Sequence, residues 1–334
     1  MSMLFNRNTA TNNPAETVIV GEGYDSPALA YADALVESSN ILNALYISDV
    51  IIESAVEDME DDEAEEVIEA TFTDVFKNIK AAAVKFFTRI KNIVMGWVKK
   101  VKDFFTEGRK FVGKYEKEIK KAKGDNYKFK SNWNLKDGID VPKTINYSLA
   151  DLRSKTKSAQ NTILSSKPSE LGKKMEEYTK YFDLVKTNLT ERASLIGRNR
   201  DNKSEEYTMN ASIKTALLTY VSKEADIIGE LNSVIDQVAE YQKAIEKACD
   251  AAVKQTDKPA AQESIRGAFK VASRGATLQS EMLNKTVSAV KGLANESARQ
   301  LKRFAMKTVK ESYTGEEEDT GNSRSVLEAA YAEL

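Results

Sequence analysis

The strongest constraint in this sequence is a run of apolar residues whose spacing alternates between four and three along the C-terminal half of the chain. The run begins at Ile213, ends at Ala252 and is broken only at Glu224. Its members are Ile213, Leu217, Tyr220, Ile227, Leu231, Val234, Val238, Tyr241, Ile245, Ala248 and Ala252. A period of about 3.5 residues is that of a coiled-coil seam, so the run predicts a long helix that packs along one stripe.

A second helix with the same spacing is expected after Pro259. Its apolar positions are Ile265, Phe269, Ala272, Ala276, Leu283, Val287, Val290, Ala294, Leu301 and Phe304. Two such helices joined by a short proline turn should form an antiparallel coiled-coil hairpin. With only 5 Pro and 15 Gly in 334 residues, the composition favours long helices throughout. We therefore expect an all-α, elongated helical bundle with little or no sheet.

Helix-start and loop signals divide the rest of the chain. Ser26 with Pro27, Ser148 with Asp151, and Pro168 each predict a helix N-terminus. The expected divisions are an acidic N-terminal arm or propeptide at 1–69, a basic amphipathic helix at 70–123, a loop or small hairpin rich in aromatic residues and Lys at 124–147, a helical bundle at 148–313, and an acidic linker with a short helix at 314–334. The coiled-coil hairpin predicted above lies within 148–313. Within 124–147, Asp137-Gly138 could form the turn of a short β-hairpin.

The basic helix carries its apolar and basic residues on opposite faces. The apolar stripe is Phe76, Ile79, Ala83, Phe86, Ile90, Ile93, Trp97, Val101 and Phe104, widened by Val75, Phe87, Val94, Val98 and Phe105. The basic residues are Lys77, Lys80, Lys85, Arg89, Lys91, Lys99, Lys100, Lys102, Arg109, Lys110 and Lys114. Only Asp74, Asp103 and Glu107 oppose them.

Three interpretations of this helix stay open. Rings on one face and cations on the other are typical of a helix that lies in a membrane interface. A basic face also suits DNA phosphates, whose neutralisation releases counterions. The third interpretation is a bundle helix with a solvated lysine face. The candidate nucleic-acid or membrane face consists of Lys77, Lys80, Lys85, Arg89, Lys91, Trp97, Lys99, Lys100 and Lys102.

In the following loop, three aromatic residues alternate with lysines. The aromatic residues are Tyr127, Phe129 and Trp133, and the lysines are Lys128, Lys130 and Lys136. Rings beside cations are what single-stranded nucleic acid binders use, whereas a small satellite core would bury the same rings.

Charge is sharply segregated along the chain. Residues 8–76 contain 17 Asp or Glu and no Lys or Arg. Since Arg7 is the only basic residue before Lys77, the remaining 258 residues hold 48 of the 49 basic residues and 34 of the 51 acidic ones. The net charge of −2 therefore hides a segment of +14, and such blocks are either solvated or have a partner of opposite charge.

Catalytic chemistry is not expected. The chain has no histidine and one cysteine, Cys249, within an apolar helical pattern. This removes the usual general base, the commonest metal ligand and the Ser-His and Cys-His nucleophile systems. We predict neither an enzyme nor a bound cofactor or metal. No secretory signal is recognised, and no run reaches the roughly 18 apolar residues of a spanning helix.

Four short sites share one sequence pattern, which consists of two branched aliphatic residues, a glutamate and a small residue. The glutamates are Glu37, Glu53, Glu69 and Glu328. This pattern resembles the sites cut by the prohead proteases of large tailed bacteriophages. The distribution of charge along the chain is similar to that of the internal head proteins of these phages. The resemblance implies an acidic capsid-targeting propeptide that is removed, and a basic, DNA-associated mature protein. Val67 stands where the pattern has Leu or Ile, and the 213–304 region shows no signature of such a family.

Taken together, these patterns predict a non-enzymatic internal virion protein, packaged with DNA in the virion interior after assembly in the host cytoplasm. The expected partners are capsid or other virion proteins and nucleic acid, and the chain could also form a homo-oligomer. One alternative is a soluble α-helical membrane-active or pore-forming protein, for which the partner is a membrane surface. Another is a cytoplasmic coiled-coil scaffold.

Overall fold

The structure is a computed structural model that describes residues 61–122, 126–139, 143–144, 147–166, 168–254 and 258–314. Its helices are α2 (Asp61–Lys121), α3 (Leu149–Ser165), α4 (Pro168–Arg192), α5 (Ala211–Val221), α6 (Glu224–Ala252) and α7 (Lys258–Thr314), with short 3-10 turns at Ala193–Leu195 and Arg200–Asn202. The strands are β1 (Lys128–Ser131), β2 (Lys143–Thr144), β3 (Tyr147–Ser148) and β4 (Glu205–Thr208). The predicted all-α fold is confirmed.

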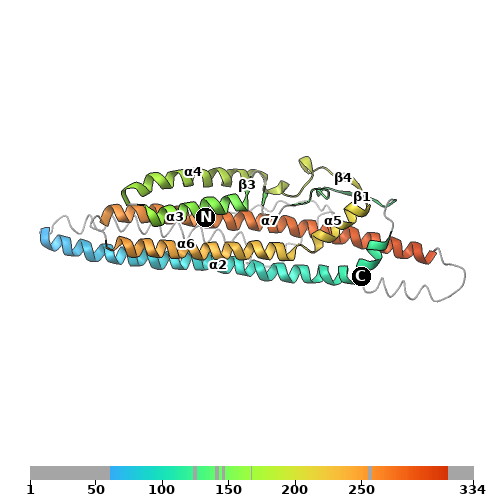
Figure 1. Cartoon of the computed structure of the whole chain (residues 1–334), viewed down its shortest axis with the longest axis horizontal. Coiled ribbons are helices and arrows are strands. Elements are labelled where there is room, and N and C mark those ends of the chain that lie inside the picture. Colours follow the sequence, from blue (N-terminus) through green and yellow to red (C-terminus); the bar gives the residue numbers. More distant parts are fainter. Residues whose placement is uncertain are drawn as a thin grey trace, which may run out of the picture.

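The long helices run along one axis, which makes the bundle elongated (Figure 1). With 61 residues, α2 is about 90 Å long at ~1.5 Å per residue. It runs in the same direction as α7, and α6 runs against both (Figure 1). A single core cluster contains side chains from Phe72 in α2 to Ala305 in α7, so α2 belongs to the same core as the rest of the bundle.

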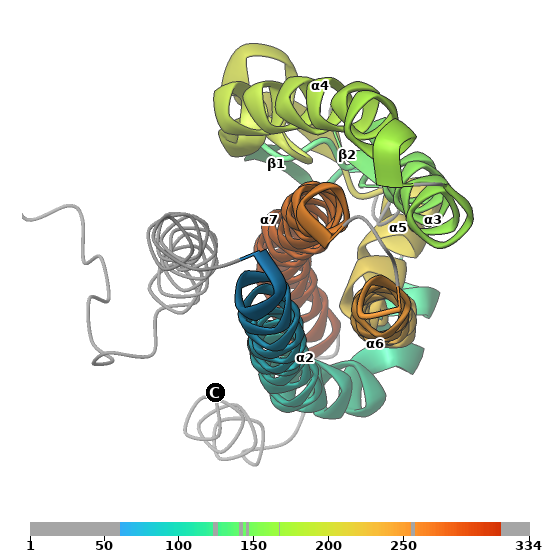
Figure 2. The ribbon, with the colours of Figure 1, turned by 90° about the vertical axis from the view of Figure 1, so that its left-hand side faces the viewer.

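Helix α7 occupies the centre of the bundle. It contacts α2, α3, α4, α5 and α6, and in the view along the bundle it lies between α2 and the layer formed by α3 and α4 (Figure 2). Its buried positions include many small and polar residues beside large apolar ones such as Phe269 and Leu283. The hydroxyls of Thr277, Ser280, Thr286 and Ser297 are buried and donate to carbonyls one turn earlier in the same helix. Because these hydroxyls need no partner from a neighbouring helix, other helices can approach α7 closely.

The predicted seam residues from Ile213 to Ala252 are buried, apart from a half-buried Ala248. The seam does not form one helix, because α5 ends at Val221 and α6 begins at Glu224. It also faces several partners. The ring of Tyr241 stacks on Phe87 of α2 at 6.1 Å between centroids, and its hydroxyl donates to the Thr156 carbonyl of α3. Helices α6 and α7 are consecutive and antiparallel, but a coiled-coil hairpin is not confirmed.

A small antiparallel sheet covers the C-terminal half of α7. Strand β1 pairs with β4, with Lys128 opposite Thr208 and Ser131 opposite Glu205. The Asp137-Gly138 turn exists, and Gly138 adopts φ +65° there. The strand before this turn nevertheless pairs with a segment some 70 residues later rather than across it. A local pair forms instead between β2 and β3.

Two predicted helix starts are confirmed. Ser148 accepts from the Asp151 backbone N–H, and the Asp151 carboxylate accepts from the Ser148 N–H, which is a complete capping box. Pro168 is the first residue of α4.

Candidate nucleic-acid interface

The apolar face of α2 is inside the bundle. Every residue of its predicted stripe is buried except Ile93, Val98 and Phe104, which are partly buried against the core. Phe86 lies 5.8 Å from Phe269 of α7 between ring centroids, in an edge-on arrangement. Trp97, which sequence reasoning assigned to the binding face, is only 6% exposed. A ligand could reach its ring only by displacing core side chains.

The basic face of α2 is open. Exposed lysines follow it from the first turns of the described core to the C-terminal end; they are Lys77, Lys85, Lys91, Lys99, Lys100, Lys102, Lys110 and Lys114. Lys80 and Arg89 are half-buried, and the side chain of Arg109 lies outside the described part. The structure thus places most of the predicted cationic residues on one helix surface that faces away from the core.

Two of these cations already have carboxylate partners. Lys77 lies 3.1 Å from Asp74, one turn earlier in α2. The Lys80 Nζ lies 2.8 Å from the Asp250 carboxylate of α6, and the hydrogen bond that Lys80 donates to this carboxylate raises the pKa of Lys80. Because each pair is internally neutral, these two lysines offer less charge to an external anion than a lysine without a carboxylate partner would.

A lysine that sequence reasoning missed lies beside the basic face. Lys291 of α7 is half-buried, and its Nζ lies 4.7 Å from the centroid of the Phe104 ring of α2. Burial lowers its pKa, and the nearby charge of Lys100 lowers it further. Neither Lys100 nor Lys291 forms an ion pair with a carboxylate among the described side chains. Lys291 is thus a partly buried cation that packs on an aromatic ring of the neighbouring helix.

The aromatic residues of the loop are part of the main core, and form neither a separate satellite core nor an open stacking platform. Phe129 stacks on Tyr207 at 5.8 Å, and Tyr127 packs edge-on against Phe304 of α7. Phe129 and Trp133 are no more than 9% exposed. With its rings packed in this way, the loop offers no row of free faces on which bases could stack.

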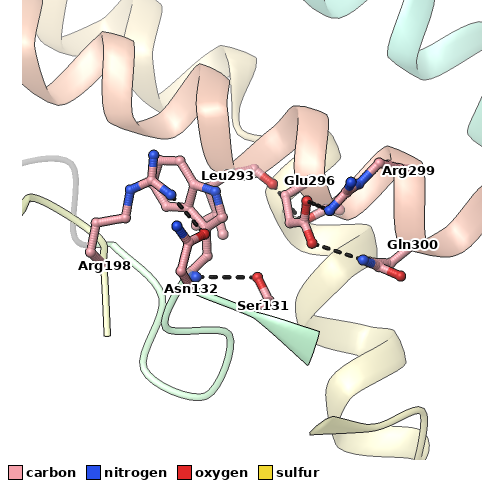
Figure 3. Close-up of polar contacts among 9 residues, drawn as sticks. Ser131, Asn132, Arg198, Leu293, Glu296, Arg299 and Gln300 are labelled. Atoms are coloured by element: carbon pink, nitrogen blue, oxygen red, sulfur yellow. Dashed lines mark hydrogen bonds and ion pairs between the residues drawn. The ribbon is translucent and has the colours of Figure 1, made fainter. Parts of the chain in front are cut away.

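Trp133 is held between the loop that contains Arg198 and α7. The Arg198 guanidinium lies 3.7 Å above its ring, and a side chain at Gly292 would meet the same ring. Arg198 also donates to Asn132 at 2.8 Å (Figure 3). Burial lowers the pKa of Arg198, an effect that Glu296 partly offsets.

The acidic residue near this cluster is Glu296, and its carboxylate has partners within α7. Glu296 is 9% exposed and accepts from Arg299 and from Gln300 (Figure 3). The Tyr207 hydroxyl donates to the Trp133 carbonyl, at 3.0 Å. The first set of contacts is internal to α7 and the second is internal to the small sheet and its loop, and neither places a nucleophile next to a base.

The remaining reactive group is Cys249. It is 1% exposed, and burial, followed by the charge of Asp250, raises the pKa of its thiol to about 12. It is therefore a neutral thiol at ordinary pH. No group of three or more His, Cys, Asp or Glu suited to a metal occurs within the described residues. Across those same ranges, no helix combines the length and the apolar content that a membrane crossing requires.

The predicted cleavage sites are only partly visible. Glu37, Glu53 and Glu328 lie outside the described residues. Glu69 belongs to the described backbone of α2, three residues before Phe72, which is the first residue of the described core. A chain that begins at Ala70 would keep every buried side chain of the described part.

Comparison of the chain with protein-family models, with curated proteins and with solved structures found no match.

Proposed function

We propose that this is a non-enzymatic internal virion protein that is packaged with DNA, and that a maturation protease removes its acidic N-terminal segment. The observation that supports this proposal most strongly is the difference in solvent exposure between the two faces of α2. The lysine face is exposed, whereas the apolar face is packed in the core. In the folded bundle, α2 can meet a polyanion without any rearrangement.

The charge layout gives the proposed cleavage a physical purpose. Residues 70–334 contain 48 basic and 35 acidic residues, so a cut after Glu69 changes the net charge from −2 to +13. During assembly the acidic segment would weaken attraction to nucleic acid, and its removal would strengthen it. Cuts after Glu37 and Glu53 would be intermediate steps, and a cut after Glu328 would free only the last six residues.

The membrane-active alternative makes a different demand on α2. An interfacial helix inserts its apolar face into lipid. Here Phe86, Phe87 and Trp97 would first have to leave the core, at a cost of several kcal/mol for each large side chain. We therefore rank DNA above lipid as the partner of this helix.

The test is binding of the chain that begins at Ala70 to a duplex of arbitrary sequence, compared with the full chain. We expect the shorter chain to bind more tightly, with an affinity that falls steeply as salt rises and does not depend on sequence. Anionic vesicles are the matched competitor. Leakage of these vesicles without DNA binding would support the membrane-active alternative. Binding to neither ligand would support the coiled-coil scaffold instead.

A further inference from the structure

We propose that the C-terminal segment of this chain, residues 326–334, docks as a short helix on the outer face of α5, in a hollow between α5 and the C-terminal end of α2. The segment lies outside the described residues, and the surface that would receive it lies within them. The docking goes beyond the proposed function, and only its release by proteolysis rests on that function.

The outer face of α5 consists of small side chains. Ser212, Thr215 and Thr219 are exposed there, three and four residues apart. The hydroxyls of Thr215 and Thr219 donate to carbonyls one turn earlier in α5, at 2.9 and 2.8 Å. Because these hydroxyls are satisfied within their own helix, a second helix can approach this face closely. Buried hydroxyls of α7 are satisfied in the same way, and other helices do pack on α7.

A hollow lies beside this face, where α5 contacts α2. Its volume is about 460 Å³, which is within the range of pockets that hold a ligand. A second hollow shares Ala211, Thr215 and Thr219 with the first, so the unfilled space extends along α5. The half-buried Leu218 packs against the core and gives the first hollow an apolar wall. The lining residues are Glu116 and Lys120 from α2, Thr215, Leu218 and Thr219 from α5, and Asp226 from α6.

Charge favours an acidic occupant. Lys214 also lines the hollow, and it donates to the backbone carbonyls of Lys120 and Ala122 at the end of α2. Those partners are neutral, so Lys214 brings a full positive charge to the hollow. Residues 315–334 contain six acidic residues and one basic residue, a net charge of −5. The C-terminal segment therefore arrives with the opposite charge.

The chain is long enough to reach the hollow. The Lys214 Nζ lies 5.9 Å from the centroid of the Phe304 ring of α7, so the hollow adjoins α7 near its end. Helix α7 continues for ten residues, about 15 Å, to Thr314. Residues 315–325 can then span up to about 36 Å. Helix α5 and the C-terminal end of α7 lie toward the same end of the bundle (Figure 1).

The sequence of the segment suits this surface. Leu327, Ala330, Tyr331 and Leu334 recur three and four residues apart, which is the pattern of one apolar helix face. Nine residues are too few for a stable helix in water, so this face needs a surface to pack on. Ala330 lies within the apolar face and permits close approach to the small side chains of α5.

The docking gives the proposed cut after Glu328 a purpose. That cut removes Ala330, Tyr331 and Leu334 and leaves only Leu327 of the apolar face. The remaining stub would lose most of its contact area with α5 and leave the hollow. Maturation would therefore uncover a surface on α5 as well as remove the acidic N-terminal segment.

Disulfide formation within the full chain tests the docking. In a Cys249→Ala background, with oxidised glutathione as the oxidant, Thr215→Cys with Ala330→Cys should form a bond within one chain. The matched pair is Thr187→Cys with Ala330→Cys, because Thr187 is an exposed threonine of α4 whose hydroxyl also donates one turn back. The first pair should react about tenfold faster or more, since docking raises the local concentration of the second thiol.

Two substitutions in the segment separate packing from charge. Leu327→Asp should reduce the rate of the first pair to that of the matched pair, because it places a charge in the apolar face. Asn322→Asp adds the same charge outside that face and should leave the rate unchanged.

Hydrogen exchange gives a second measurement that needs no cysteine. Amides of α5 should exchange about fivefold faster or more in a chain that ends at Glu328 than in the full chain, whereas amides of α4 should not change. Equal exchange of α5 in the two chains, or equal rates for the two cysteine pairs, would overturn the docking. A bond between two chains would assign the hollow to a second copy and overturn it as well.

The docking and the proposed function fail separately. A native chain that still ends at Leu334 would contradict the release and leave the docking intact. Failure of the chain that begins at Ala70 to bind duplex would overturn the proposed function without changing the expected bond between residues 215 and 330.

Discussion

Helices α2 and α7 are the two longest helices of the described chain, and they differ in how much of their surface is packed against other helices. Helix α2 buries one stripe of large apolar side chains and leaves a lysine face to solvent. Helix α7 is contacted by five other helices, and its buried positions combine Ala, Ser, Thr and Gln with large apolar residues such as Phe269 and Leu283. A helix on the outside of a bundle can carry a functional face, whereas the central one is constrained over nearly its whole surface. The two helices are in contact where Lys291 of α7 packs on the Phe104 ring of α2.

The largest expected effect is on the packed face of α2. Phe86 is completely buried between α2 and α7, so Phe86→Ala should lower the free energy of unfolding by about 3–5 kcal/mol in urea titrations. Lys91→Ala, on the exposed face of the same helix, should change it by less than about 0.5 kcal/mol. Equal effects would mean that α2 does not belong to the folded core in solution, and would return the membrane interpretation to consideration.

Two glycines compare the helices directly. A Cβ added at Gly292 of α7 would lie 2.5 Å from the Trp133 ring, whereas a Cβ at Gly96 of α2 would meet nothing within 4 Å. Gly292→Ala should therefore destabilise the protein by about 1–3 kcal/mol. Gly96→Ala should stabilise it by up to about 1 kcal/mol through helix propensity. If thermal unfolding gives the same sign for both, Trp133 does not seat on α7 as described.

Cys249 reports on the buried side of the α6 helix. Its pKa is raised to about 12 from a reference value of 9.0, so the folded state retains a proton that the unfolded state loses first. This contribution to stability is complete below about pH 8 and declines as pH rises toward about 12. The difference in unfolding free energy between the parent and Cys249→Ala should thus shift by about 1 kcal/mol against the parent between about pH 8 and pH 10. A difference that does not change over this range would show a solvated thiol.

The smallest effect is expected at the exposed lysines. Lys77 and Asp74 form a pair 3.1 Å apart, with both side chains about 70% exposed. Lys77→Gln should change the unfolding free energy by no more than about 0.5 kcal/mol, because water and salt screen such pairs. A loss as large as that of Gly292→Ala would mean that the lysine face stabilises the fold and is not free for a ligand.

Local signals were enough for most of the helices. The Ser148–Asp151 capping box, Pro168 at the start of α4 and the two faces of α2 depend on neighbouring residues, and the sequence displays them directly. The seam from Ile213 to Ala252 was correctly predicted as buried, but its period does not identify what covers it. A heptad pattern describes one surface of a helix, and that surface can meet one partner or several.

What could not be predicted depends on residues far apart in the chain. Strand β1 pairs with β4 about 70 residues later, and two short polar segments give no sign of that pairing. The contact of Lys291 with the Phe104 ring requires α2 and α7 to lie side by side at one particular register, which no local pattern encodes. Trp97 was assigned to a binding face because aromatic residues suit interfaces, whereas the core of the bundle supplies its apolar surroundings.

The most direct test of the account is the intact mass and N-terminal sequence of the protein isolated from the particle or cell in which it occurs. We predict that the native chain begins at Ala70, and that Glu69→Gln leaves a longer and more acidic product because the protease loses the carboxylate it recognises. A native chain that begins at Met1 or Ser2 and still ends at Glu333 and Leu334 would contradict the processing, and with it most of the case for a virion protein.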